Sequence, residues 1–259
     1  MKQNLVFCNF KDKELDDIKN LLCKIFVTTR SQIASLYQDI IDDFQEDGWP
    51  PHFVNRNFFK SEDHVFQDIY KLSPSVAVDL PSLFELDNAE KDKPTIVILG
   101  QDSKSNQDSE EIHLGTPYGL HHRGSREVLN RTKLYFKMIT TLLEAGYRVY
   151  LTDIYKIWVC NPNRPYDGIN LPKGEQEKFV SVLKEEFSII NPVALVTWGK
   201  VSANSVRAMK FDIPHLNFPH PSGAANGAWS KLINKSPTDE NKLAYWNTVI
   251  SEALPKEIQ

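Results

Sequence analysis

Apolar and polar residues follow two different rhythms along this chain of 259 residues. In the first part, residues 14–46 place apolar side chains at the spacing of one helix face. Ser31 is the expected N-cap of the second helix in this stretch. The paired prolines Pro50 and Pro51 end the pattern, because proline cannot continue a helix. Residues 1–93 are therefore predicted to form a helical N-terminal region.

From residue 94 onward, short apolar runs alternate with amphipathic segments. A run followed by a helix, repeated along the chain, is typical of a parallel sheet covered by helices on both faces. We therefore predict an α/β fold for residues 94–259, a three-layer sandwich with a central, largely parallel four-stranded sheet. The predicted strands are residues 95–100, 147–154, 192–199 and 213–221, and the predicted helices are residues 129–146, 174–190, 202–210 and 242–254.

Chemically able residues stand at or just beyond the ends of these predicted strands. They are Asp102, Asp153, Gly199 and His220, one for each strand. In open parallel sheets, ligands bind at the carboxyl ends of the strands. We therefore expect the side chains of Asp102, Asp153 and His220 to converge on one pocket at this edge of the sheet.

Composition adds the broad class of the protein. A hydrophobic content of 41% and a charged content of 25% are ordinary for a soluble globular protein. No apolar run approaches the ~18–20 residues that cross a bilayer. The first residues lack the long apolar segment and the cleavage site of a signal peptide. We expect a cytoplasmic protein with no membrane partner.

Cysteines and histidines do not suggest a cofactor. Cys8, Cys23 and Cys160 are far apart and form no CxxC pair, so we expect reduced, packed thiols. They cannot supply the four thiolates of a normal iron–sulfur cluster, and the histidines lack zinc-like spacing. The chain also has no GxxxxGK[ST] or GxGxxG loop, which argues against an unrelated nucleotide-binding enzyme.

Net charge leaves nucleic-acid binding open. The formal charge is −4, whereas nucleic-acid-binding domains are usually basic. Residues 123–137 nevertheless carry five basic residues against the single acid Glu127. This stretch is either a locally positive surface near the site or an ordinary solvated helix face. The basic residues are Arg123, Arg126, Arg131, Lys133 and Lys137.

Three short motifs occur in a fixed order at the predicted strand ends. GQD stands at residues 100–102, VTWGK at residues 196–200 and HPS at residues 220–222. Together they resemble the uracil-DNA glycosylase superfamily, closest to the branch whose first motif begins GQD. The resemblance spans roughly residues 94–250, and the N-terminal region has no comparable match. It implies a monofunctional DNA N-glycosylase that flips a pyrimidine and leaves an abasic site.

The resemblance also implies roles for individual residues. Asp102 would stabilise the oxocarbenium-like sugar and orient the attacking water, and His220 would donate to the base oxygen that gains negative charge. Gln101 would contact the base, and the segment at residues 117–122 would place His122, or His121 in a register shifted by one, beneath it. The structural alternatives are a helix N-cap for Asp102, a core histidine for His220 and a surface loop for the histidine pair.

Two departures from the family pattern concern the base. The uracil-specific branch has proline and tyrosine after GQD, where this chain has Ser103 and Lys104. Its uracil reader is an asparagine, where this chain has Asp153. An ionised carboxylate only accepts hydrogen bonds, so it suits the N4 amino group of cytosine, and a protonated one could also donate to N3. We expect a cytosine-type base, with C5 substitution, although Asp153 could instead cap a helix or form a salt bridge.

Contacts with the DNA backbone are expected from Ser103, Lys104, Ser222, Gly223 and Ala224. After HPS the family usually inserts an apolar side chain into the DNA stack, whereas this chain offers small residues, with Trp229 further on. Small residues make a poor wedge. This weakness keeps a catalytically weak modified-base or DNA-binding module open as an alternative.

The expected partner is DNA that contains the target pyrimidine, and we expect a monomer without metal or cofactor. A glycosylase of this kind would serve base-excision repair or, if it acts on C5-modified cytosine, defence against phage DNA. A conventional uracil-DNA glycosylase is the remaining alternative.

Overall fold

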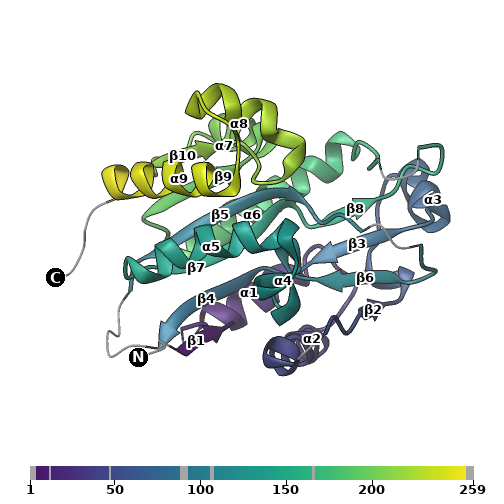
Figure 1. Cartoon of the computed structure of the whole chain (residues 1–259). Coiled ribbons are helices and arrows are strands. Elements are labelled where there is room, and N and C mark those ends of the chain that lie inside the picture. The colour runs from purple at the N-terminus through teal and green to yellow at the C-terminus, as the bar shows by residue number, and fades with distance from the viewer. Residues whose placement is uncertain are drawn as a thin grey trace.

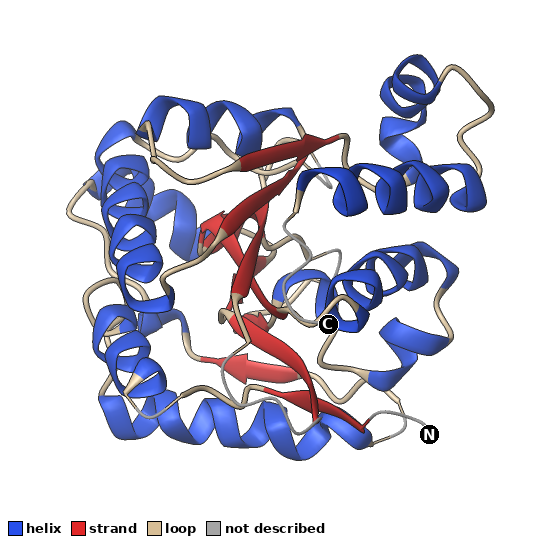
Figure 2. Ribbon diagram, turned by 90° about the vertical axis from the view of Figure 1, so that its left-hand side faces the viewer, coloured by secondary structure: helices blue, strands red, loops and turns tan. Residues whose placement is uncertain are grey.

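The computed structural model describes most of the chain, and every structural statement below refers to the described residues. These are residues 4–11, 13–46, 48–87, 93–105, 108–164 and 167–254. Their centre is a six-stranded sheet with the strand order β1-β4-β7-β5-β9-β10. Figure 2 shows these strands between two layers of helices. The predicted α/β sandwich is confirmed.

Four neighbouring strands of this sheet are the ones that the apolar runs predicted, and they pair in parallel. Almost all residues of β5, β7 and β9 are buried, as expected for parallel strands that are covered on both faces. Their carboxyl ends therefore lie at one edge of the sheet. In spatial order the strands are β7 (Arg148–Tyr155), β5 (Thr95–Asp102), β9 (Ala194–Trp198) and β10 (His215–Phe218).

The N-terminal region extends this sheet. β4 (Ser82–Asp87) pairs antiparallel with β7, and β1 (Asn4–Phe7) pairs antiparallel with β4. The helical description of residues 1–93 is therefore incomplete, because this region contributes strands as well as helices. The boundary expected between residues 93 and 94 does not divide the main sheet, because strands from both sides of this boundary belong to it.

A second sheet with the order β2-β6-β3-β8 lies beside the first (Figure 1). The chain passes from one sheet to the other at Lys156, because β7 ends just before this residue and β8 begins just after it. β3 ends at Asp79, which pairs with Gly115 of β6. The strands are β2 (His52–Val54), β6 (Ile112–Gly115), β3 (Val76–Asp79) and β8 (Ile157–Val159).

Helices cover both faces of the main sheet. Figure 1 shows α5 in front of the sheet and α6 behind it. α9 packs on α5, and α8 packs on α9, whereas α1 packs on both α6 and α2. α7 packs on β5 and β9. The bounds are α1 (Glu14–Leu22), α2 (Arg30–Asp42), α5 (Asn130–Glu144), α6 (Lys173–Ile190), α7 (Lys200–Met209), α8 (Asn226–Ile233) and α9 (Asp239–Ala253).

The cap of α2 differs from the prediction. Thr29, not Ser31, is the N-cap, and its side chain accepts a hydrogen bond from the backbone N–H of Gln32. The Gln32 side chain accepts in return from the backbone N–H of Thr29, which completes a capping box. The prediction for Ser31 is wrong because a better-placed hydroxyl precedes it.

None of the described helices is long and apolar enough to cross a membrane.

Short elements complete the fold. The remaining elements are η1 (Asp43–Gln45), η2 (Arg56–Phe58), α3 (His64–Leu72), η3 (Pro117–Gly119), α4 (Arg123–Glu127) and η4 (Gly223–Ala225).

Candidate functional site

A pocket of about 750 Å³ lies at the carboxyl ends of the central strands, where the two sheets meet. Asp102, Asp153 and His220 all line it, so the structure brings the three residues together as expected. Of the other expected site residues, Gln101, Ser103, Lys104 and His122 line the same pocket, whereas Ser222, Gly223 and Ala224 do not.

Asp102 ends β5 and is partly buried at the pocket. Gln101 Nε2 donates to its Oδ2 at 2.8 Å. Burial raises the pKa of the Asp102 carboxyl, and the hydrogen bond from Gln101 and the charge of Lys104 oppose that rise. Asp102 is not a helix N-cap, because β6 is the next described element after it. The Asp102 side chain is therefore fixed by the hydrogen bond from Gln101 and faces the pocket.

His220 follows β10 on a loop that is held at several points. Trp229 Nε1 donates to the backbone oxygen of His220 at 2.9 Å, and Lys242 Nζ donates to that of Pro221 at 3.1 Å. The backbone N–H of Ser222 donates to Nδ1 of His220 at 3.3 Å. Since an N–H group only donates, Nδ1 accepts, and the neutral imidazole carries its proton on Nε2.

Burial lowers the pKa of His220, so the imidazole is neutral at pH 7. A neutral ring that has Nδ1 engaged offers one donor, Nε2–H, to a ligand. His220 also lines the pocket, which makes it a site residue and not the core histidine of the structural alternative.

Asp153 belongs to β7 and is 2% exposed. Its carboxyl lies against Gly100, because a Cβ atom at that position would be 2.1 Å from Asp153 Oδ1. The first glycine of the GQD motif thus has a steric reason: its missing side chain makes room for this carboxyl group. Asp153 caps no helix, and no salt bridge to it is seen among the described residues.

Asp79, at the end of β3, is a pocket residue that the sequence analysis missed. Its carboxyl group and that of Asp153 line the same pocket, and each influences the pKa of the other. Burial raises the pKa of Asp79 to about 7, and burial together with the neighbouring charge of Asp79 holds the pKa of Asp153 well above its usual range. Two adjacent carboxylates cannot both ionise easily, so the pair holds a proton near neutral pH. The available signal was an acid directly after the apolar run of residues 76–78.

A buried cation lies behind Asp153 without pairing with its carboxyl group. Lys156 Nζ donates to Glu186 at 2.8 Å and to the backbone oxygen of Asp153 at 2.7 Å. It also donates to Thr152 Oγ1 at 2.5 Å. These contacts fix the end of β7, while the positive charge lowers the pKa of Asp153 less than burial and Asp79 raise it.

An aromatic side chain, Tyr118, lies among these residues. Its ring centroid is 4.8 Å from that of Tyr135, 5.3 Å from that of Trp198 and 5.9 Å from that of His220. Its hydroxyl is buried, has no hydrogen-bond partner among the described residues and lies beside Gly100. The backbone of Tyr118 has φ 63°, a left-handed conformation that is unusual for a bulky residue.

The two histidines of this segment lie less centrally. His122 lines the pocket, but it stands at the N-cap position of α4. His121 is 2% exposed, and its Nδ1 pairs with Thr116 Oγ1 at 3.0 Å. Burial lowers the pKa of His122 to about 4 and that of His121 well below its usual range. Stacking by His122 stays a prediction, and the position of Tyr118 makes that residue the stronger candidate.

The basic stretch is only partly a charged surface. Arg126 is buried, donates to backbone oxygens and lies 3.9 Å above the ring of Phe44. Arg123 forms an ion pair with Glu127 at 3.1 Å. Lys133 and Lys137 are exposed on α5. Positive charge at the pocket itself comes from elsewhere, namely Lys104 and Lys200.

The hydroxyls expected to contact phosphate are already engaged. Ser103 is buried and donates to the backbone oxygen of Ala77 at 3.1 Å. Ser222 Oγ lies 2.8 Å from Nδ1 of His220. Trp229 is fully buried and therefore cannot enter a DNA stack. Among the expected backbone contacts, only Lys104 is an exposed, pocket-lining side chain.

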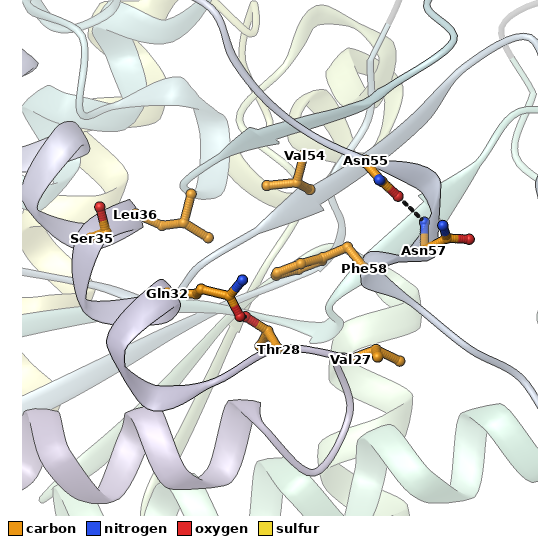
Figure 3. Close-up of a pocket in the computed structure, with 9 residues that line it drawn as sticks. All are labelled: Val27, Thr28, Gln32, Ser35, Leu36, Val54, Asn55, Asn57 and Phe58. Carbon is orange, nitrogen blue, oxygen red and sulfur yellow. Dashed lines mark hydrogen bonds between the residues drawn. The ribbon is translucent and has the colours of Figure 1, made fainter.

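A second pocket of about 430 Å³ lies between α2 and the β2–η2 segment (Figure 3). It is lined by apolar, hydroxyl and amide side chains, with no titratable residue.

The three cysteines are free thiols, two of them buried. The described residues also contain no cluster of histidine, cysteine and acidic side chains arranged to hold a metal ion.

A scan of family models and a search of curated proteins both found no match to this sequence.

Proposed function

We propose that this protein is a DNA N-glycosylase that hydrolyses the bond between a flipped pyrimidine and its deoxyribose. One observation carries the proposal: a carboxylate, Asp102, and a neutral imidazole, His220, line the same pocket at the carboxyl ends of β5 and β10. The order of the GQD, WG and HPS motifs at those strand ends supports it further.

The two groups suit opposite ends of one breaking bond. Cleavage of the glycosidic bond leaves positive charge on the sugar and negative charge on the base. An ionised Asp102 stabilises the sugar cation and orients a water molecule toward it. The Nε2–H group of His220 donates to the base oxygen on which negative charge gathers. Because His220 is held by Trp229 and Ser222, this donor is fixed before the reaction starts.

The base is proposed to be of the cytosine type, with a substituent at C5. Asp153 stands where the uracil-specific glycosylases that the motifs resemble carry an asparagine. Its carboxyl can accept a hydrogen bond from the N4 amino group of cytosine. Lys104 replaces the tyrosine that closes the pocket against C5 substituents in those enzymes. A pocket of about 750 Å³ offers room for such a group. Base-excision repair and defence against phages with modified DNA are the two settings for this activity.

Two observations favour a DNA-binding module as the second candidate. The loop after HPS has no exposed large apolar wedge, since Trp229 is buried. The base reader is also altered. A module of this kind would bind modified DNA without releasing a base.

The test is a panel of duplex and single-stranded DNAs that carry uracil, cytosine, 5-methylcytosine or 5-hydroxymethylcytosine at one position. Alkaline cleavage reports abasic sites, and gel shift reports binding. We expect abasic sites in a C5-substituted cytosine strand, and none with the double variant Asp102→Asn/His220→Ala. Binding without cleavage would support the module, and efficient release of uracil alone would support a conventional uracil-DNA glycosylase.

A further inference from the structure

Two carboxyl groups from different sheets meet on the inner wall of the pocket. Asp153 comes from β7 of the main sheet, and Asp79 comes from the end of β3 in the second sheet. Both carboxyls line the same pocket, and Asp153 is only 2% exposed. Two neighbouring carboxylates in such a place repel each other, so one of them holds a proton near neutral pH.

The surroundings keep that proton in place. Asp102 of β5 adds a negative charge near the pair, and the neighbouring buried side chain of Tyr118 in η3 carries no positive charge. Lys156 is the cation nearby, and its Nζ is engaged by Glu186, Thr152 and the backbone of Asp153. Asp153 Oδ2 is buried and receives no hydrogen bond from any described N–H or hydroxyl group. This oxygen of Asp153 therefore has no donor that would stabilise a negative charge on it.

A proton held at this point has a chemical use. Uracil leaves as an anion whose charge spreads over two oxygens, and a donor such as His220 can stabilise it. Cytosine has an amino group in place of one oxygen, and its anion is more basic. Protonation of its N3 acceptor makes it a better leaving group. General acid catalysis of this kind typically contributes ~10²–10⁴-fold to a rate.

We propose that the Asp79–Asp153 pair is the general acid for departure of the base: Asp153 donates the shared proton to N3 of a cytosine-type base. Asp79 is the positioning residue: its negative charge keeps Asp153 protonated before the substrate binds. This inference rests on the proposed glycosylase function, and it assigns a role to Asp79, which lies outside the glycosylase-like motifs.

The step balances without any other reactant. As the bond between C1′ and N1 breaks, its electron pair stays with the base. The O–H bond of Asp153 breaks, the proton joins N3, and the base leaves neutral. Water adds to C1′ and gives one proton to Asp102, from which it passes to solvent. Solvent returns one proton to the carboxyl pair, and the site is restored.

The kinetic test uses single-turnover base release from the best C5-substituted cytosine DNA of the panel, between pH 5 and pH 9. The wild-type rate should fall as pH rises through the pKa of the pair. In Asp79→Asn the amide donates to Asp153 and the like charge is gone, so the falling limb should move to lower pH by at least about one unit. Asp153→Asn should slow release by ~100-fold or more and abolish that limb.

The matched control is Asp39→Asn, which changes an exposed carboxyl on α2 and should leave the profile unchanged. A falling limb that stays in place in both pocket variants, with base still released, would overturn the general acid and leave the glycosylase standing. Release of uracil alone, or of no base from any DNA, would overturn the general acid together with its substrate.

A second measurement needs no substrate. The full-length protein labelled with ¹³C at aspartate carboxyls should show one carboxyl that stays protonated at pH 7. That signal should disappear in Asp153→Asn and titrate at lower pH in Asp79→Asn. If every aspartate of the folded wild-type protein is ionised at pH 6, the proposal is wrong, whatever the activity assays give.

Discussion

The two walls of the pocket hold their polar groups by different means. On the β5–β10 wall, Asp102 and His220 each have their own hydrogen-bond partners, from Gln101 and from the loop at residues 219–222. On the β3–β7 wall, Asp153 Oδ2 has no hydrogen-bond partner among the described residues, and Asp79 is the neighbouring charge that most affects the pKa of Asp153. Burial shifts pKa values on both walls, but the hydrogen bond from Gln101 opposes that shift at Asp102, whereas the like charge of Asp79 adds to it at Asp153. A difference of this kind pushes the pKa values of neighbouring acids apart, which is how a site obtains a base and an acid from the same residue type.

On the first wall, the largest effects are expected from loss of its two catalytic groups. Asp102→Asn and His220→Ala should each slow base release by at least ~10-fold, or ~1.4 kcal/mol of barrier. DNA binding should change little, because neither group is needed to hold the backbone. Single-turnover kinetics and gel shift on the same DNA measure the two quantities, with Asp39→Asn as control. Full activity in the double variant would place the chemistry elsewhere.

Gly100 joins the two walls, and a methyl group there should disturb both. In Gly100→Ala the new Cβ would be 2.1 Å from Asp153 Oδ1 and 2.7 Å from the Tyr118 hydroxyl. Overpacking of this kind typically costs ~1–3 kcal/mol, so the midpoint of urea unfolding should fall and base release should weaken. Gly174→Ala is the matched control, since nothing lies within 4 Å of its Cβ position. Equal stability of the two variants would contradict this packing.

The second wall should set the choice of base. Asp153→Asn restores an amide that donates to O4 of uracil and accepts from its N3–H group. The preference should move from cytosine-type bases toward uracil by ~1–3 kcal/mol, the range of a bidentate base contact. The ratio of single-turnover rates on matched uracil and cytosine-type DNAs measures this shift. A native protein that already prefers uracil, with a ratio that the substitution does not change, would rule out Asp153 as the base reader.

The smallest effect concerns stability against pH. Because the folded protein raises the pKa values of Asp79 and Asp153, their contribution to stability is greatest below the unfolded value of ~3.9 and is lost as pH rises through the folded values. For Asp79 that loss extends to about pH 7. Asp79→Asn removes it, so its free energy of unfolding relative to wild type should rise by about 1 kcal/mol between pH 6 and pH 8. A relative stability that falls over this range would contradict the raised pKa of Asp79.

Sequence alone could predict the first wall and the central sheet. The strands that end near Asp102 and Asp153 are buried on both faces, so their apolar runs are unambiguous. The short N-terminal strands lack that signal: β1 pairs with β4, and β4 pairs with β7, which follows far along the chain. No local pattern reveals such a pairing.

The second wall could be predicted only in part for the same reason. Asp79 follows a short apolar run, as the other site acids do, but it becomes a site residue only because β3 lies beside β8 and β6. Conversely, Arg126 and Trp229 belong to residue types that often bind nucleic acid, yet both are buried and hold the fold. Burial and pairing, which the sequence does not display, separate these cases.

The most direct measurement is detection of free base by mass spectrometry after incubation of the wild-type protein with DNA that carries a C5-substituted cytosine. We expect free substituted cytosine to appear in equal amount to the alkali-labile sites, and we expect the Asp102→Asn/His220→Ala variant to release none. Tight binding of that DNA with no free base and no abasic sites would contradict it.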